Sequence, residues 1–166
     1  MIWGMSIPTF TAVHVVISLI GIAAGLVVLF GMLGNRWLPR WNAVFLWMTI
    51  LTSVTGFGFP FDPDHLLPSH KVGILSLVLL AAALLALYGK NMSGGWRKTY
   101  VYTAMISEYL NVFVLIVQAF QKAPALHALA PNGKEPPFAI VQGVVLVIFA
   151  FLIFRAARRF RGEAAR

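Results

Sequence analysis

The chain has no cysteine and few charged side chains, which make up 11% of its 166 residues. Without cysteine, the protein has no disulfide, no thiolate catalysis, no iron–sulfur cluster and no Cys-ligated zinc. A soluble domain usually carries roughly a quarter charged residues. Because 60% of the residues are hydrophobic, a chain this short has too little polar surface to cover several long apolar runs in water. The sequence therefore predicts an integral membrane protein.

Acidic residues are also scarce, with 5 Asp and Glu against 13 Lys and Arg, so the formal net charge is +8. The basic residues do not form one amphipathic face, as a nucleic-acid surface would require, and lie instead at the ends of apolar segments. This distribution is typical of topology signals and lipid-headgroup contacts. The expected partner is the bilayer, with other membrane subunits or a homo-oligomer left open and nucleic acid excluded.

Five apolar segments each approach the roughly 20 residues needed to cross a bilayer. The connections between them contain Asn, Gly and Pro, which interrupt helices. The sequence thus predicts an all-α fold: a single transmembrane domain over residues 1–166, with five membrane-spanning helices. The expected spans are 9–33, 42–59, 70–88, 100–120 and 138–154. The first has no basic region before it and is longer than a signal-peptide core, so we interpret it as an uncleaved span.

Basic residues alternate between the two sides of this arrangement. Ten follow spans one, three and five, and three lie on the opposite side. Since positive charge marks the cytoplasmic side, we expect the N-terminus outside and the C-terminus in the cytoplasm. Four aromatic residues near the predicted inner edge are interpreted as interfacial anchors: Trp41, Tyr88, Trp96 and Tyr100.

Span four carries a polar stripe. At about 100° per residue, six polar side chains lie close to one line along the helix, with Glu108 beside them: Tyr100, Thr103, Ser107, Asn111, Gln118 and Gln121. A carboxylate near the middle of a bilayer costs a few kcal/mol even on lenient scales. Glu108 must therefore face protein or enclosed water, and another part of the chain must cover it.

Two interpretations of this polar interior remain open. Glu108 and its neighbours form a path for protons or a small polar solute, or they are hydrogen-bonding groups that hold helices together, each contributing on the order of 1 kcal/mol. The residues concerned are Ser107, Glu108, Asn111, Gln118 and Gln142. We interpret the amides as interhelical contacts, with Asn111 or Gln142 expected to bond Glu108. Glu108 itself is interpreted as functional, because ionisable groups at that depth usually are.

Two histidines suggest an alternative. His14 shares a helix face with Gly21 and Gly25, a small-xxx-small pattern that usually marks close helix packing. The same glycines would also leave a groove for a flat cofactor. His70 opens span three from the same side of the membrane. Two neutral imidazoles from different helices are the ligand set of a low-spin b-type haem, so His14 and His70 are candidate ligands of haem b.

The end of span two is rich in glycine and phenylalanine, from Thr55 to Phe61. Gly56 and Gly58 do not stabilise a regular helix end, so we expect an unwound, aromatic-lined outer mouth. Asp62, Asp64 and His65 follow in the loop 60–68. No further carboxylate or histidine arrives at ligand spacing, so a solvated loop is favoured over a metal site.

Several stretches together resemble a family of short uncharacterised bacterial five-pass inner-membrane proteins. These are Tyr109 to Lys122, Glu135 to Phe138, the region of His14, and Thr52 to Phe61. The likeness covers most of the chain. It implies a bacterial inner (cytoplasmic) membrane location and five passes, and it brings no activity and no residue roles.

The sequence leaves two function classes. The first is a small binding or permeation bundle centred on Glu108, and the alternative is a membrane redox protein that holds haem b between His14 and His70. An enzyme ranks last, because the sequence has no nucleophile paired with a base and no metal cluster.

Overall fold

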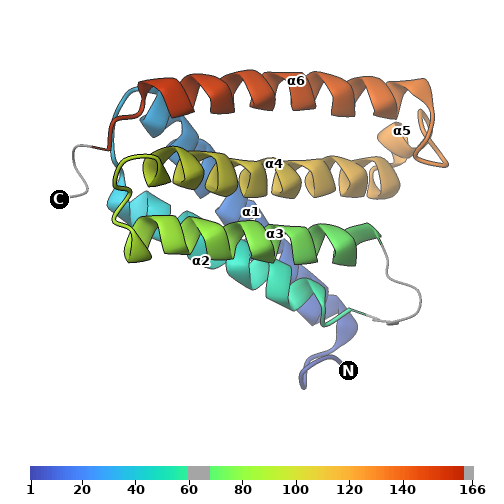
Figure 1. Cartoon of the computed structure of the whole chain (residues 1–166). Coiled ribbons are helices and arrows are strands. Elements are labelled where there is room, and N and C mark those ends of the chain that lie inside the picture. Colours follow the sequence, from blue (N-terminus) through green and yellow to red (C-terminus); the bar gives the residue numbers. More distant parts are fainter. Residues whose placement is uncertain (60–67, 163–166) are drawn as a thin grey trace.

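The computed structural model describes residues 1–59 and 68–162, and in this part of the chain all regular structure is helical (Figure 1). The elements are α1 (Ile7–Leu33), α2 (Pro39–Gly56), α3 (Pro68–Leu84), η1 (Leu85–Gly89), α4 (Trp96–Lys122), α5 (Pro124–His127) and α6 (Pro136–Arg159). Each of the five predicted segments coincides with a long helix. The all-α prediction is confirmed.

The helices begin earlier than predicted, because prolines that were expected to interrupt the chain lie in first turns. Pro39 begins α2 and Pro136 begins α6. Proline is favoured at the first helical position, where its missing N–H would have no acceptor and its fixed φ already suits the helix. The connection between the fourth and fifth predicted spans is also partly helical, since α6 starts within it at Pro136.

Within the described residues, four helices are long and apolar enough to cross a membrane: α1, α3 continued through η1 (Ser69–Gly89), α4 and α6. Five were predicted. The difference is α2, which has 18 residues and would be about 27 Å long. Its polar side chains lower its hydropathy, and several of them are buried in the bundle: Asn42, Thr49, Ser53 and Thr55.

Helix α2 runs antiparallel to α1 over most of its length. Near the end of α1, Gly31 lies against Leu38, the residue before α2. In the middle, Gly21 lies against Met48 and Thr49. At the other end, His14 contacts Thr55. Helix α2 therefore covers the same depth of the bundle as most of α1.

Helix α4 is the central element. It packs against α1, α2, α3 and α6, and Figure 1 shows it between α3 and α6 with α1 and α2 behind. Tyr100 in its first turns is fully buried and hydrogen-bonds Asn42 of α2. The prediction that Tyr100 is an interfacial anchor was wrong, because this position faces α2. Trp41 and Tyr88, by contrast, are 49% and 65% exposed.

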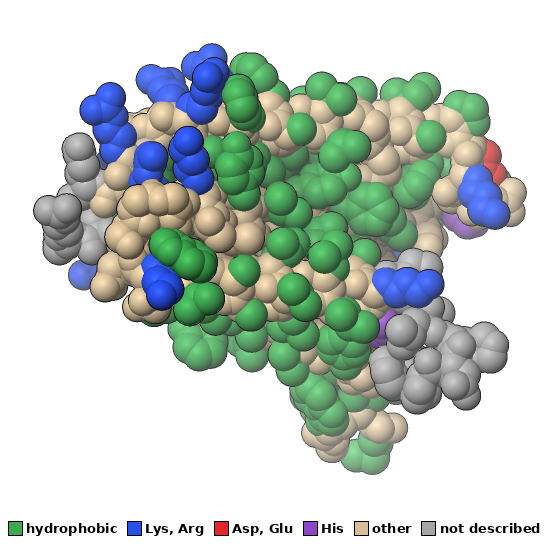
Figure 2. Space-filling view, viewed as in Figure 1, with side chains coloured by type: hydrophobic (Ala, Val, Ile, Leu, Met, Phe, Trp, Pro, Cys, Tyr) green, Lys and Arg blue, Asp and Glu red, His purple; other side chains and the backbone are tan. Residues whose placement is uncertain are grey.

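Charged and apolar side chains occupy different surfaces. Figure 2 shows Lys and Arg concentrated at the end of the bundle where α6 ends, with apolar side chains along the helix flanks. We call this the basic end. Its residues come from the ends of α1, η1 and α6 and the starts of α2 and α4. The backbone N–H of Arg161 donates to Asn35 Oδ1 (2.8 Å), which ties the end of α6 to the α1–α2 connection.

At the opposite end, Glu135 precedes α6 and organises the turn before it. Its carboxylate accepts hydrogen bonds from the backbone N–H groups of Asn132 (3.0 Å) and Lys134 (2.9 Å) and from the Asn132 side chain (2.8 Å). Desolvation acts to raise the pKa of Glu135, but these hydrogen bonds outweigh it and lower the pKa to about 2. The turn is held by a stable anion at the positive end of the α6 dipole.

Candidate functional site: a polar seam around Glu108

Glu108 lies near the middle of α4 and is fully buried. Its carboxyl group is pressed against Gly25 of α1, so closely that a Cβ at Gly25 would lie 2.9 Å from Oε1 and closer still to Oε2. Glycine is therefore required at this position to leave room for the carboxyl. The Gly21–Gly25 face thus packs against neighbouring helices, with Gly21 on α2 and Gly25 on α4, as small residues at helix interfaces usually do.

The Glu108 carboxyl has no hydrogen-bond partner among the described residues, at either oxygen. The Asn111 side chain lies close enough to interact with the carboxyl, but the geometry between them falls outside that of a hydrogen bond, and Asn111 Nδ2 donates to Thr49 Oγ1 of α2 (3.2 Å). Gln142 of α6 donates to the backbone oxygen of Phe113 (3.1 Å). Both amides that were expected to bond Glu108 are therefore paired with other groups, and they do join helices, as the interpretation of interhelical contacts requires.

The partners of the α4 stripe lie on α2. Asn42 accepts a hydrogen bond from the Tyr100 hydroxyl, and Thr49 accepts one from Asn111. We use the term polar seam for Asn42, Thr49, Tyr100, Glu108 and Asn111. The sequence reasoning missed the α2 side of the seam. The signal was present, because Asn42, Thr49 and Ser53 fall within roughly 40° of one line at 100° per residue, and all three are buried.

The rest of the predicted stripe does not join the seam. The Ser107 hydroxyl donates back to the Thr103 carbonyl of its own helix (3.0 Å), a local bond that satisfies the hydroxyl without linking helices. Gln118 is partly exposed and Gln121 is exposed. The stripe is therefore buried at Tyr100, Ser107 and Glu108, partly buried at Thr103, Asn111 and Gln118, and exposed at Gln121.

His14 and His70 both contact the last turn of α2 and the residues that follow it. His14 Nδ1 hydrogen-bonds Thr55 Oγ1 (2.7 Å), and its ring meets Phe59 edge-on (5.2 Å). His70 is buried and stacks on Phe57 (5.8 Å, interplanar angle 16°). The structure brings the two histidines to one end of the bundle but gives each its own aromatic neighbour. Haem ligation stays a prediction, and no group of three or more metal-ligating side chains occurs in residues 1–59 and 68–162.

The predicted outer mouth is packed with rings. Helix α2 ends at Gly56. A Cβ at Gly58 would lie 2.6 Å from Phe10 Cζ, and Phe10 also packs edge-on against Phe59 (5.2 Å). The glycine thus allows α1 to approach this turn closely. Asp62, Asp64 and His65 of the 60–68 loop lie outside the described residues.

Comparisons with protein-family models, with curated proteins and with solved structures found no match to this chain.

Proposed function

We propose that the chain is a small permeation bundle that moves protons across the membrane through Glu108. The observation that carries the proposal is the fully buried carboxyl without a hydrogen-bond partner among the described residues. A carboxyl kept only for helix association would be expected to hydrogen-bond a neighbouring helix, because an unpaired buried polar group costs stability. Its retention at the centre of α4 favours a role in chemistry.

A proton suits this site better than a larger solute. Glu108 is packed directly against Gly25, whereas a solute would need space beside the carboxyl. Groups able to exchange protons or hydrogen bonds lie on both sides of it. Toward the basic end are Tyr100 and Asn42, and toward the opposite end are Asn111 with Thr49 and then His14 with Thr55. Water between these groups would complete the path.

The test is proton flux into vesicles reconstituted with the full chain and containing a pH-sensitive dye. Glu108→Gln preserves the shape of the side chain and removes its titration, so flux is expected to fall to the level of protein-free vesicles. Glu135→Gln is the control, because it makes the same change outside the polar seam, in the turn before α6, and should leave flux unchanged. Equal flux from the wild type and Glu108→Gln would contradict the proposal.

We further propose that α2 is the fifth span and that the protein lies in a bacterial inner membrane with its N-terminus outside. Three observations support this topology: the antiparallel course of α2 along α1, the burial of its polar face against α4, and the concentration of cations at one end. Because its polar side chains face other helices, α2 needs less hydropathy than a helix surrounded by lipid.

Reporter fusions test this topology. With five passes, a reporter after Arg166 should score cytoplasmic, and reporters before Met1 and in the 131–137 connection should score external, because the ten cations that follow spans one, three and five in the sequence remain inside. With only four crossings, the two ends of the chain would lie on the same side. Matching scores at Met1 and Arg166 would therefore exclude α2 as a span.

A further inference from the structure

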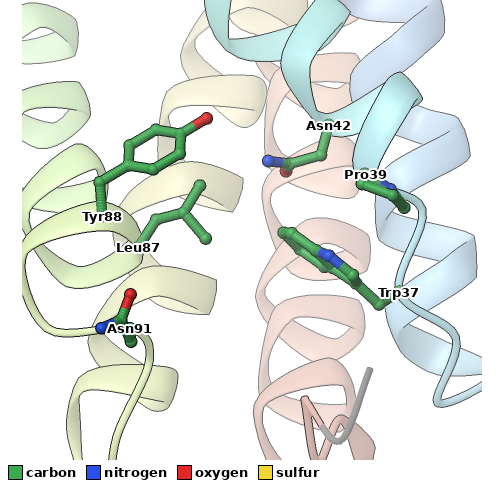
Figure 3. Close-up of a pocket in the computed structure, with 6 residues that line it drawn as sticks. All are labelled: Trp37, Pro39, Asn42, Leu87, Tyr88 and Asn91. Carbon is green, nitrogen blue, oxygen red and sulfur yellow. The ribbon is translucent and has the colours of Figure 1, made fainter. Parts of the chain in front are cut away.

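A cavity of about 240 Å³ opens at the basic end, away from Glu108. Figure 3 shows it between the first turn of α2 and the end of η1. Its lining combines two aromatic rings, two amides and two apolar side chains: Trp37, Pro39, Asn42, Leu87, Tyr88 and Asn91. The Trp37 wall is held in place by ring contacts with Tyr100 and Phe160, each at 6.0 Å. We call this space the first cavity.

Asn42 offers a hydrogen-bond donor to the first cavity. The residue is only 2% exposed, and its Oδ1 is occupied by the Tyr100 hydroxyl. Its Nδ2 has no acceptor in the part of the chain that the structure describes, and Figure 3 shows the amide directed into the space between Tyr88 and Trp37. A nearly buried amide whose N–H groups point into a cavity indicates a ligand with acceptor oxygens.

The helix that contributes Asn42 is also uncapped. The residue before α2 is Leu38, which makes no side-chain capping bond, and the first turn contains no acidic residue. Pro39 has no N–H, and the Asn42 N–H donates to the Leu38 carbonyl (2.9 Å). The N–H groups of Arg40 and Trp41 therefore lack the acceptor that a capping side chain would provide, and they carry the positive end of the helix dipole. Helix N-termini of this kind bind phosphate groups.

Among the described residues, the charged side chains near the cavity are all basic. Arg36, Arg40 and Lys90 directly adjoin lining residues in the sequence, and all three are exposed. The two carboxylates among the described residues lie elsewhere, with Glu108 at the middle of α4 and Glu135 at the opposite end. The surroundings therefore favour an anion at low cost in repulsion.

A second cavity, of about 160 Å³, adjoins the first and shares Tyr88 with it. It follows α2 and α3 away from the basic end, and most of its lining is apolar: Ala43, Leu46, Trp47, Ile50 and Leu84. The two cavities together form a groove with a polar, cationic end and an apolar continuation. That is the polarity of a phospholipid, with its headgroup at the membrane surface and its acyl chain below.

We propose that this groove is a binding site for an anionic phospholipid, with the phosphate in the first cavity and the start of an acyl chain in the second. Asn42 Nδ2 and the first turn of α2 donate to the phosphate oxygens. Arg40 and Lys90 select for negative charge, and Tyr88 separates the polar part of the site from the apolar part. This site shares Asn42 with the proposed proton path but does not involve Glu108.

The full chain in a mild non-ionic detergent is titrated with dihexanoyl-phosphatidylglycerol, dihexanoyl-phosphatidylcholine and inorganic phosphate, and thermal stability reports binding. We expect phosphatidylglycerol to raise the melting temperature most. Asn42→Asp keeps an acceptor for Tyr100 but replaces the donor with negative charge, so it should weaken phosphatidylglycerol binding about tenfold or more. The double variant Arg40→Gln/Lys90→Gln changes only exposed residues and should weaken binding by about tenfold as well.

The matched control is Lys71→Gln/Lys134→Gln, which removes two cations from the opposite end and should leave the affinity unchanged. An equal loss of affinity in this control would overturn the proposal, since it would show a general effect of net charge. Equal stabilisation by phosphatidylcholine would exclude selection for an anion. Stabilisation by inorganic phosphate as large as that by phosphatidylglycerol would identify a site for free phosphate and would exclude the lipid.

Discussion

Gly25→Ala is expected to destabilise the bundle by about 1–3 kcal/mol, the usual cost of adding a methyl group to a filled interior. The new Cβ would occupy the space of the Glu108 carboxyl, 2.9 Å from Oε1 and nearer to Oε2. The carboxyl would have to move within a fully buried site, or α1 and α4 would have to separate. The free energy of unfolding in mixed detergent micelles measures the effect.

Gly143 of α6 provides the matched control. It also lies inside a long helix, but nothing lies within 4 Å of the position that a Cβ would take there. Gly143→Ala is therefore expected to leave stability unchanged or slightly higher. Adding Glu108→Asp to Gly25→Ala shortens the acidic side chain by one methylene and should restore part of the loss. Equal stability of Gly25→Ala and Gly143→Ala would show that the carboxyl does not require this glycine.

Much of the helical arrangement was predictable, because long apolar runs indicate the helices and the Asn, Gly and Pro residues between them indicate the connections. The run containing Gly21 and Gly25 predicted close helix packing, and the structure places α2 and α4 there. The predicted starts of α2 and α6 were wrong because Pro39 and Pro136 were expected to be helix breakers. Proline interrupts a helix in its interior but is favoured in its first turn, so the residue type alone does not distinguish the two cases. Sequence alone also did not show that α3 closes with the π-helical turn η1.

The site was only half predictable. The position of Glu108 within an apolar run identified it as the central residue of the site. A carboxyl inside a membrane is unusual whichever helices surround it. Its surroundings depend on which helices meet, and spacing within α4 does not contain that information. Tyr100 illustrates the limit: a tyrosine near a helix end is typical of the membrane interface, yet Asn42 of α2 makes this position an interior one. The polar face of α2 was predictable from the spacing of Asn42, Thr49 and Ser53.

Glu108→Met is expected to make the protein more stable while abolishing proton flux. Methionine is unbranched and close to glutamate in shape, so it should fit beside Gly25 with little strain. Because neither Glu108 oxygen has a hydrogen-bond partner among the described residues, the substitution removes an unsatisfied polar group and leaves no neighbour unpaired. Asn111 keeps Thr49 and Gln142 keeps the Phe113 carbonyl. A gain of about 1–3 kcal/mol in the free energy of unfolding follows from the desolvation cost that is relieved.

Glu108→Gln distinguishes the gain in stability from the loss of a side chain that can take up and release a proton. Glutamine keeps a polar group that must still be desolvated, so its stability should stay near that of the wild type while flux disappears. The expected order of stability is Met above Gln and Glu, and the expected order of flux is Glu above both others. A residue that is retained for function at a cost in stability gives this pattern, in which the substitution that raises stability abolishes flux. Destabilisation of the bundle by Glu108→Met would instead show that the carboxyl holds helices together, and its place at the centre of the seam would then be structural.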